Sequence, residues 1–359
     1  MNLILCALLA VALTEDPLRA VLRSPKAALN LYSSFKAENH LAFAAGEDRM
    51  RFKLFLNSAE QVADFNEDPT DTAHYVLNMF SSMTEEETKQ YEGLNATEAV
   101  EGPAPELQSS RLSVPSSVQW TNVGGVTEVK RQGSCGSCWA FAATAAAETR
   151  YWAKSGVLRN LAEQEYLDCA YEHQAGKNGC KGGWMYMAYD WSVNNGGRLA
   201  SQVDYPYTQR DSVCQGNSKA NALVGASLEG PKSVARGEAA NIAALANGPV
   251  AVAVKTTPKF HSYGGNIMRD TTCPSGISHA IALVGYTSTY VVAKNSWGPN
   301  WGDSGFIRFT RGFHNCNLWN YSVYPVFQKR RTTDRNRSDA ATSYRPSNDG
   351  GDDVDPNWD

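Results

Sequence analysis

The feature that most constrains this chain is a pair of cysteines placed directly before a helical run. Cys135 and Cys138 lie within the stretch Gln132–Trp139, and an alanine-rich segment, 140–147, follows them. If Cys138 begins that helix, its sulfur lies at the positive end of the helix dipole, which favours the thiolate over the thiol. The stretch therefore predicts a nucleophilic cysteine that works with a base from elsewhere in the chain.

The N-terminus and the net charge narrow the class of protein. Of the 359 residues 42% are hydrophobic, and the formal net charge is −4, which argues against nucleic acid as a main partner. The apolar run 3–13 is too short to span a bilayer, and its position predicts a secretory signal peptide over residues 1–13. A buried N-terminal helix is the alternative. No later segment has the pattern of a membrane span, so we expect a soluble mature protein.

Composition divides the remaining chain into three parts. Residues 14–111 are charged and lack cysteine, with helical periodicity over 41–65 and an exposed linker at 101–105 that suits a processing protease. Residues 112–327 are richer in Gly, Trp and Tyr and hold the remaining cysteines. Residues 328–359 are first basic and then acidic, and we expect them to be disordered.

The part 112–327 changes its pattern along its length. Its first half has helical patterns at 140–154 and 161–166, whereas after Pro249 short β runs follow, at 250–254, 280–286, 290–294 and 306–309. This order predicts an α+β fold with a helical half, a sheet-rich half and a cleft where they meet.

Cysteine counting indicates a free thiol. Eight cysteines are present, Cys6 leaves with the signal peptide, and the odd remainder implies at least one unpaired thiol in a secreted chain. Counting alone does not say which thiol is free. The Cys-x-x-Cys pair also allows a dithiol redox motif or half of a zinc site. However, no βαβ pattern precedes it and no second close cysteine pair follows.

Several blocks, taken together and in order, resemble the papain family of cysteine proteases. The resemblance covers roughly residues 112–327 and is carried by Gln132–Phe141, Gly179–Gly183, Ser278–Ala280, Lys294–Gly298 and Trp301-Gly302. It implies a papain-like two-lobed α+β fold, with a helical left lobe, a β-barrel-like right lobe and the cleft between them. A weaker resemblance to the family's helical inhibitory prosegment lies upstream, at Glu47, Arg51, Phe55, Asn66, Asn78 and Phe80.

The resemblance assigns catalytic roles to four residues and a supporting role to Trp297. Cys138 is the nucleophile, and His279 takes up a proton and later returns it to the leaving amine. Asn295 orients the imidazole, and Trp297 covers that contact from water. Gln132 donates to the developing oxyanion beside the backbone N–H of Cys138.

The resemblance also implies the substrate contacts and the disulfides. Gly182 and Gly183 present backbone to an extended peptide. The pocket for the residue two positions before the cut is apolar, which predicts a hydrophobic preference there; its walls are Trp184, Met185, Ala253, Ile277, Ala280 and Tyr321. The implied bridges leave Cys138 free; they are Cys135–Cys180, Cys169–Cys214 and Cys273–Cys316.

The expected protein is therefore a secreted or lysosomal/vacuolar endopeptidase, made as an inactive precursor. The resemblance implies no cofactor and no metal. Its expected partners are peptide and protein substrates, its own prosegment and protein inhibitors of cysteine proteases, and the enzyme is expected to be a monomer. Two other functions remain open: a catalytically silent peptide-binding protein of the same fold, and a dithiol oxidoreductase.

One departure from the family lies beside the histidine. Family members usually carry Asn or Asp there, and this chain has Ser278. Without a neighbouring carboxylate the imidazolium loses support, so we expect the alkaline limb of activity at lower pH. Replacing Ser278→Asp is expected to move that limb to higher pH in a pH–rate profile, and an unchanged profile would contradict this.

Overall fold

The computed structural model describes residues 15–94, 114–170, 179–313 and 315–329. The predicted signal peptide 1–13, the linker at 101–105 and the tail beyond residue 329 lie outside these ranges. Among the described residues, no helix combines the length and the apolar character that a membrane crossing requires.

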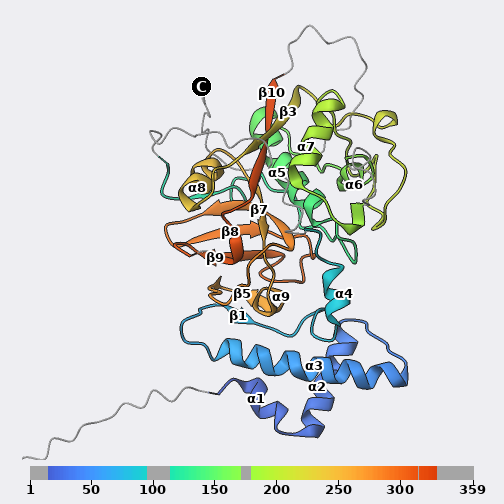
Figure 1. The fold of residues 1–359 in the computed structure, drawn as a ribbon, viewed down its shortest axis with the longest axis vertical. Coiled ribbons are helices and arrows are strands. Elements are labelled where there is room, and N and C mark those ends of the chain that lie inside the picture. The colour runs from blue at the N-terminus through green and yellow to red at the C-terminus, as the bar shows by residue number, and fades with distance from the viewer. Residues whose placement is uncertain (1–14, 95–113, 171–178, 314, 330–359) are drawn as a thin grey trace, which may run out of the picture.

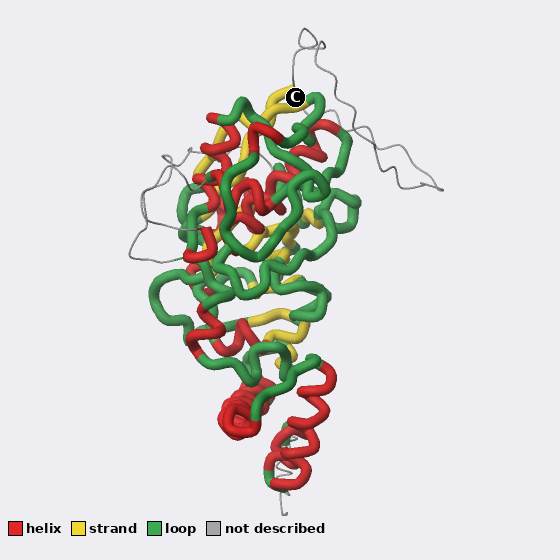
Figure 2. Tube along the Cα trace, turned by 90° about the vertical axis from the view of Figure 1, so that its right-hand side faces the viewer, coloured by secondary structure: helices red, strands yellow, loops and turns green. Residues whose placement is uncertain are grey.

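The N-terminal segment, residues 15–94, forms a helical layer at one end of an elongated molecule (Figure 1, Figure 2). Asp16 and Ser24 cap the first two helices through their side chains, and a proline follows each cap. The helix predicted over 41–65 is confirmed except for its first four residues, since α3 begins at Ala45 and ends at Asn66, before Asp68-Pro69. The elements are α1 (Pro17–Leu22), α2 (Pro25–Glu38), α3 (Ala45–Asn66), β1 (His74–Tyr75) and α4 (Glu85–Lys89).

A buried arginine ties α3 to α4. Arg51 is only 8% exposed, and its guanidinium donates to Glu47 Oε1 at 2.9 Å, to Glu87 Oε1 at 2.6 Å and to the Ser82 carbonyl at 3.0 Å. Glu87 also completes a capping box with Thr84 at the start of α4. One guanidinium therefore holds two helices and the turn that precedes α4.

We expect Arg51→Met to lower the free energy of unfolding of this layer by about 1.5–3 kcal/mol, because the charged hydrogen bonds are lost. Arg51 lowers the pKa of Glu87 from 4.5 to about 2. The pair therefore contributes stability above the ordinary carboxyl pKa and loses it only as the pH falls towards 2. Limited proteolysis of residues 15–94 at neutral pH measures the effect, with exposed Arg49→Met as control. Equal cleavage rates in both variants would contradict it.

The rest of the chain is built on one sheet of eight strands among the described residues. Its order is β3-β10-β4-β7-β8-β9-β6, with β2 beside β7, and all pairs except β6–β9 are antiparallel. The four predicted strands are confirmed. The strands are β2 (Val118–Gln119), β3 (Ala226–Ser233), β4 (Val250–Val254), β6 (Ile267–Met268), β7 (His279–Tyr286), β8 (Tyr290–Lys294), β9 (Phe306–Thr310) and β10 (Ser322–Lys329). A separate pair, β1 with β5 (Tyr263–Gly265), joins the N-terminal segment to this part.

Helix α5 (Cys138–Ser155) packs against β7 and β10, and its alanines allow a close approach. α6 (Glu163–Cys169) and α7 (Met185–Asn194) also pack against α5, and α7 contacts β3 and β10 of the sheet as well. α8 (Glu238–Ala246) and α9 (Pro258–Ser262) flank the sheet. Short 3-10 helices lie at Gly179–Lys181, Gly216–Ser218 and Asn315–Asn317. The predicted α+β class, with a helical part and a sheet-rich part, is confirmed.

Several boundaries differ from the sequence expectation. The predicted tail starts at 328, but β10 continues to Lys329 because Gln328 and Lys329 pair with Ser227 and Ala226. The helix expected at 161–166 lies at Glu163–Cys169, and α7 was not predicted at all. The division at Pro249 is also incomplete, because β2 and β3 precede it and belong to the sheet.

Candidate active site

Cys138 is the first residue of α5, as the sequence predicts, and it is fully buried. The structure pairs Cys135 with Cys180, and the other bridges are Cys169–Cys214 and Cys273–Cys316. Cys138 is the free cysteine of the described residues. Because Cys135 is bonded elsewhere, this arrangement does not support a Cys135–Cys138 dithiol. Asp270 lies near the Cys273–Cys316 sulfurs, but a disulfide leaves neither thiolate free to bind a metal.

His279 and Asn295 lie on neighbouring strands and are joined by a hydrogen bond. His279 begins β7, Asn295 follows β8, and His279 Nε2 lies 2.8 Å from Asn295 Oδ1. The same Oδ1 accepts from the Ser296 backbone N–H at 2.8 Å, which fixes the orientation of the amide. The Trp297 ring lies 4.6 Å from the His279 ring and is 2% exposed, so it shields this contact from water.

Gln132 points a donor into the same cleft. Its Nε2 donates to the Tyr91 carbonyl at 3.1 Å and to the Cys135 carbonyl at 2.9 Å. Its Oε1 accepts from Ser296 Oγ at 2.6 Å, so this hydroxyl determines which end of the amide faces the cleft. Sequence reasoning did not single out Ser296, although it lies inside the block Lys294–Gly298.

The N-terminal segment crosses the cleft at residues 91–94. Gly183 N–H donates to the Gly93 carbonyl at 3.1 Å, and Gly93 N–H and Leu94 N–H both donate to the Ser278 carbonyl at 3.0 Å. A Cβ at position 93 would lie 2.0 Å from the Gly136 carbonyl oxygen and 3.1 Å from Cys138 Sγ, so only glycine fits. The crossing chain is thus bonded to both sides of the cleft and covers the thiol.

This cover changes the ionisation of the site from what the sequence predicts. Burial raises the pKa of Cys138 to about 12, against the effect of nearby backbone N–H groups, including that of Ala280. Burial also lowers the pKa of His279 to about 4, and its Nδ1 has no hydrogen-bond partner among the described residues. The expected thiolate–imidazolium pair is therefore not favoured in this form, because both groups are removed from water.

The predicted pocket residues are brought together beside this crossing. Leu94 lies in the same apolar cluster, together with Trp184, Met185, Ala253, Ile277, Ala280 and the half-buried Tyr321. The Trp184 and Tyr321 rings are 6.0 Å apart. Gly182 has φ +124, and a Cβ there would lie 2.6 Å from the Gly93 carbonyl oxygen. Gly182 therefore allows the Gly93 backbone to approach, and the neighbouring Gly183 donates its N–H to the same carbonyl.

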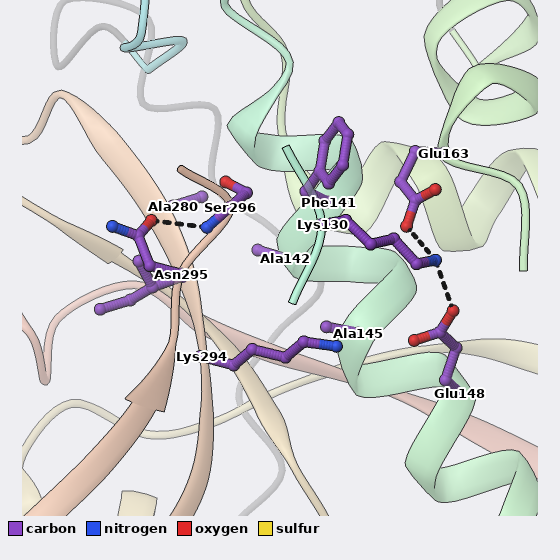
Figure 3. A pocket seen from close by; sticks show the side chains of 11 residues that line it. Lys130, Phe141, Ala142, Ala145, Glu148, Glu163, Ala280, Lys294, Asn295 and Ser296 are labelled. Atoms are coloured by element: carbon purple, nitrogen blue, oxygen red, sulfur yellow. Dashed lines mark hydrogen bonds and ion pairs between the residues drawn. The ribbon is translucent and has the colours of Figure 1, made fainter. Parts of the chain in front are cut away.

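A buried ion network lies behind the site, between α5 and the sheet (Figure 3). Lys130 Nζ lies 2.8 Å from Glu148 Oε1 and 2.5 Å from Glu163 Oε1. Lys294 Nζ donates to Thr127 Oγ1 at 2.8 Å, and burial lowers the pKa of Lys294 to about 8. Because Thr127 Oγ1 also donates to Glu148 Oε2, the network connects α5, which carries Cys138, to the strand that leads into Asn295.

Comparison with known proteins agrees with this geometry. Residues 114–326 match the family described as "Papain family cysteine protease". Fruit bromelain from Ananas comosus is 33% identical over 311 residues, which cover 83% of this chain and 86% of that protein. A cathepsin L-like proteinase from Phaedon cochleariae is also 33% identical, over 82% of this chain and 93% of its own.

Two solved precursor structures are similar to most of this chain. The recombinant stem bromelain precursor has a TM-score of 0.74 at 31% identity and covers 83% of this chain and 98% of its own. Digestive procathepsin L 3 of the Tenebrio molitor larval midgut has a TM-score of 0.72 at 30% identity, with the same coverage. Both include a part that matches residues upstream of the papain domain, since that domain alone is shorter than the matched length. The chain thus belongs to the papain family of cysteine proteases and is a thiol endopeptidase made as a proenzyme.

Proposed function

We propose that Cys138 Sγ attacks the carbonyl carbon of a peptide bond and forms an acyl-enzyme. His279 accepts the thiol proton and donates it to the leaving amine; it then deprotonates the water that hydrolyses the thioester. Asn295 orients the ring, and Gln132 Nε2 with the Cys138 backbone N–H receives the oxyanion. The observation that carries this proposal is the Tyr91 carbonyl, a peptide oxygen already bound by Gln132 Nε2, while Gly93 of the same segment covers the buried Cys138.

The segment 15–94 acts as the inhibitor of this site. The carbonyl bound by Gln132 belongs to Tyr91, whereas the residue whose backbone lies next to Cys138 is Gly93. Two different residues thus occupy the two positions that one scissile carbonyl would fill. The segment is bound without presenting a bond for attack.

The apolar pocket selects a hydrophobic side chain two positions before the cut. Leu94 in the same cluster supports this choice, and the six pocket residues include no charged group. A panel of fluorogenic peptides should favour Leu or Val over Arg at that position, and preferred hydrolysis of the Arg peptide would contradict it.

We further propose the boundaries and the setting of the mature enzyme. Removal of residues 1–13 and of the prosegment to about 111 leaves a monomeric peptidase whose last described strand, β10, ends at Lys329. It acts in a lysosomal, vacuolar or secreted setting, and protein inhibitors of cysteine proteases enter the same cleft. A relative named digestive cysteine proteinase 1, from Homarus americanus, is 35% identical and supports that setting.

Thiol labelling of the processed protein tests the proposal. Iodoacetamide should alkylate one residue, Cys138, and activity towards an apolar peptide should fall in parallel with labelling. E-64, which occupies a solved bromelain structure that is 36% identical, should protect the same thiol. Labelling of Cys138 in a protein that hydrolyses no peptide would instead support the silent peptide-binding alternative.

A further inference from the structure

A second polar site lies beside the catalytic one and holds a carboxylate in this structure. Glu92, which precedes Gly93 in the crossing segment, has a side chain only 15% exposed. Its Oε1 accepts a hydrogen bond from Thr256 Oγ1 and lies 3.6 Å from His261 Nε2. The Glu92 side chain therefore projects into the β-sheet side of the cleft rather than into solvent.

The walls of this site belong to the part that remains after the prosegment leaves. Thr256 follows β4, His261 lies in α9, and Ser278 precedes β7. The β4–β7 pairing, with Val254 opposite His279, brings Thr256 and Ser278 together although they are far apart in sequence. The site is therefore part of the peptidase domain and not of the inhibitor.

The hydrogen bonds inside the site are polarised towards an acceptor. Ser278 Oγ accepts from Thr256 N–H at 3.1 Å and lies 2.8 Å from Thr256 Oγ1. An ionised carboxylate can only accept hydrogen bonds, so the Thr256 hydroxyl donates its hydrogen bond to Glu92. The Ser278 hydroxyl then donates to Thr256 Oγ1. Thr256 and Ser278 are 5% and 4% exposed, so these hydroxyls have little access to water.

His261 contributes a buried ring nitrogen, Nε2, to the same site. Its ring stacks on Trp297, with centroids 5.5 Å apart and planes 22° apart, and it also contacts Phe80 of the prosegment. Its Nε2 is buried and has no hydrogen-bond partner among the described residues. Glu92 thus accepts a hydrogen bond from Thr256 Oγ1 and has His261 Nε2 3.6 Å away, where a protonated ring would attract it, with His279 close enough to act electrostatically on its carboxylate.

The order of residues in the crossing segment indicates on which side of the scissile bond this site lies. Gly93 lies against the thiol, Leu94 on one side belongs to the cluster of the proposed acyl-side pocket, and Glu92 lies on the other side. That other side contains His279, which protonates the leaving amine in the proposed mechanism. We propose that Thr256, Ser278 and His261 form a subsite for an acidic side chain on the substrate residue directly after the scissile bond.

This inference rests on the proposed peptidase function and adds a substrate preference to it. A glutamate at that position would replace Glu92 on the same donors. A glutamine would turn its own NH₂ donors, or a weaker neutral acceptor, towards them. We expect kcat/KM to be roughly tenfold higher for the glutamate peptide, the size of one hydrogen bond to a charged group.

The test uses two internally quenched peptides that differ only in Glu or Gln after the cut, with Leu two positions before it. The processed enzyme is assayed at mildly acidic pH, and mass spectrometry of the products confirms the bond that is cleaved. Thr256→Val removes the hydroxyl, and His261→Phe keeps the stacked ring but removes the donor. Thr289→Val, on the exposed turn at the far end of β7, is the matched control.

The measured quantity is the ratio of kcat/KM for the Glu peptide to kcat/KM for the Gln peptide, taken separately for each protein. A loss of activity that affects both peptides equally therefore cancels. The ratio should fall towards one in Thr256→Val and His261→Phe and stay at the wild-type value in Thr289→Val. A wild-type ratio of one or less overturns the subsite while leaving the peptidase function intact. Failure to hydrolyse either peptide would instead reject the proposed function, provided that a separate sample of the same preparation shows Cys138 to be reactive towards iodoacetamide.

A second measurement changes only the prosegment, so it does not require any variant of the peptidase domain to fold. In the full precursor, Glu92→Gln should shorten the time for processing, because the prosegment loses its charged contact with Thr256 and His261. Glu86→Gln, on the neighbouring helix α4, is the control. Equal processing times for Glu92→Gln and Glu86→Gln would contradict the carboxylate site.

Discussion

Cys138→Ala is expected to lower peptide hydrolysis by the processed enzyme by ~10⁴-fold or more, since no other nucleophile can form the acyl-enzyme. Every other cysteine in the described residues is held in a disulfide, so no second thiol can take over. The loss should appear in kcat, because the peptide contacts made by Gly183 and Gln132 remain. Initial rates with an apolar peptide measure it.

The control for this variant is Ser155→Ala, a substitution of similar size at the other end of α5. It should retain wild-type turnover, which separates loss of the nucleophile from general disturbance of the helix. Turnover by Cys138→Ala within tenfold of wild type would contradict covalent catalysis through this residue.

The intact precursor is expected to resist alkylation at Cys138, whereas the processed enzyme reacts at least ~10³-fold faster. Burial beneath Gly93 raises the pKa of Cys138 to about 12, so the thiolate is a very small fraction of the species present at neutral pH. When the segment leaves, water and the free Nδ1 of His279 become available to support the thiolate. The rate of iodoacetamide labelling, followed by mass spectrometry on both forms, measures the difference.

The pH dependence of the labelling rate checks independently that the ionisation of Cys138 causes this difference. In the precursor the thiolate is the minor species, so the labelling rate should rise about tenfold per pH unit through the neutral and alkaline range. The processed enzyme should instead reach a plateau at acidic pH, where the imidazolium pair is already formed. A precursor that labels at the same rate as the processed form would show that residues 91–94 do not suppress the nucleophile.

The elements that carry the proposed chemistry could be predicted because each is marked by a local pattern. α5 follows from the alanine run after Cys138, and β4, β7 and β8 are continuous apolar runs bounded by turn residues. Their order along the chain matches the family blocks, which is why Cys138, His279 and Asn295 could be named before their geometry was known.

The parts that were not predicted depend on contacts between distant segments. The ionisation of Cys138 is determined by Gly93, which only the folded chain brings to the sulfur. The Thr256–His261 site forms because β4 and β7 pair, and neither residue belongs to a recognisable motif. α7 was missed since its aromatic residues, such as Tyr186, Tyr189 and Trp191, have low helix propensity and gain their stability from burial.

The three disulfides all connect residues between Cys135 and Cys316, and residues 15–94 contain no cysteine. Once the chain is cut downstream of Leu94, the inhibitor becomes a separate molecule that is retained only by its affinity. Before the cut its local concentration is fixed by the tether, whereas afterwards it depends on the volume into which it diffuses. Dilution of the cut chain would therefore switch the enzyme on without any further chemical step.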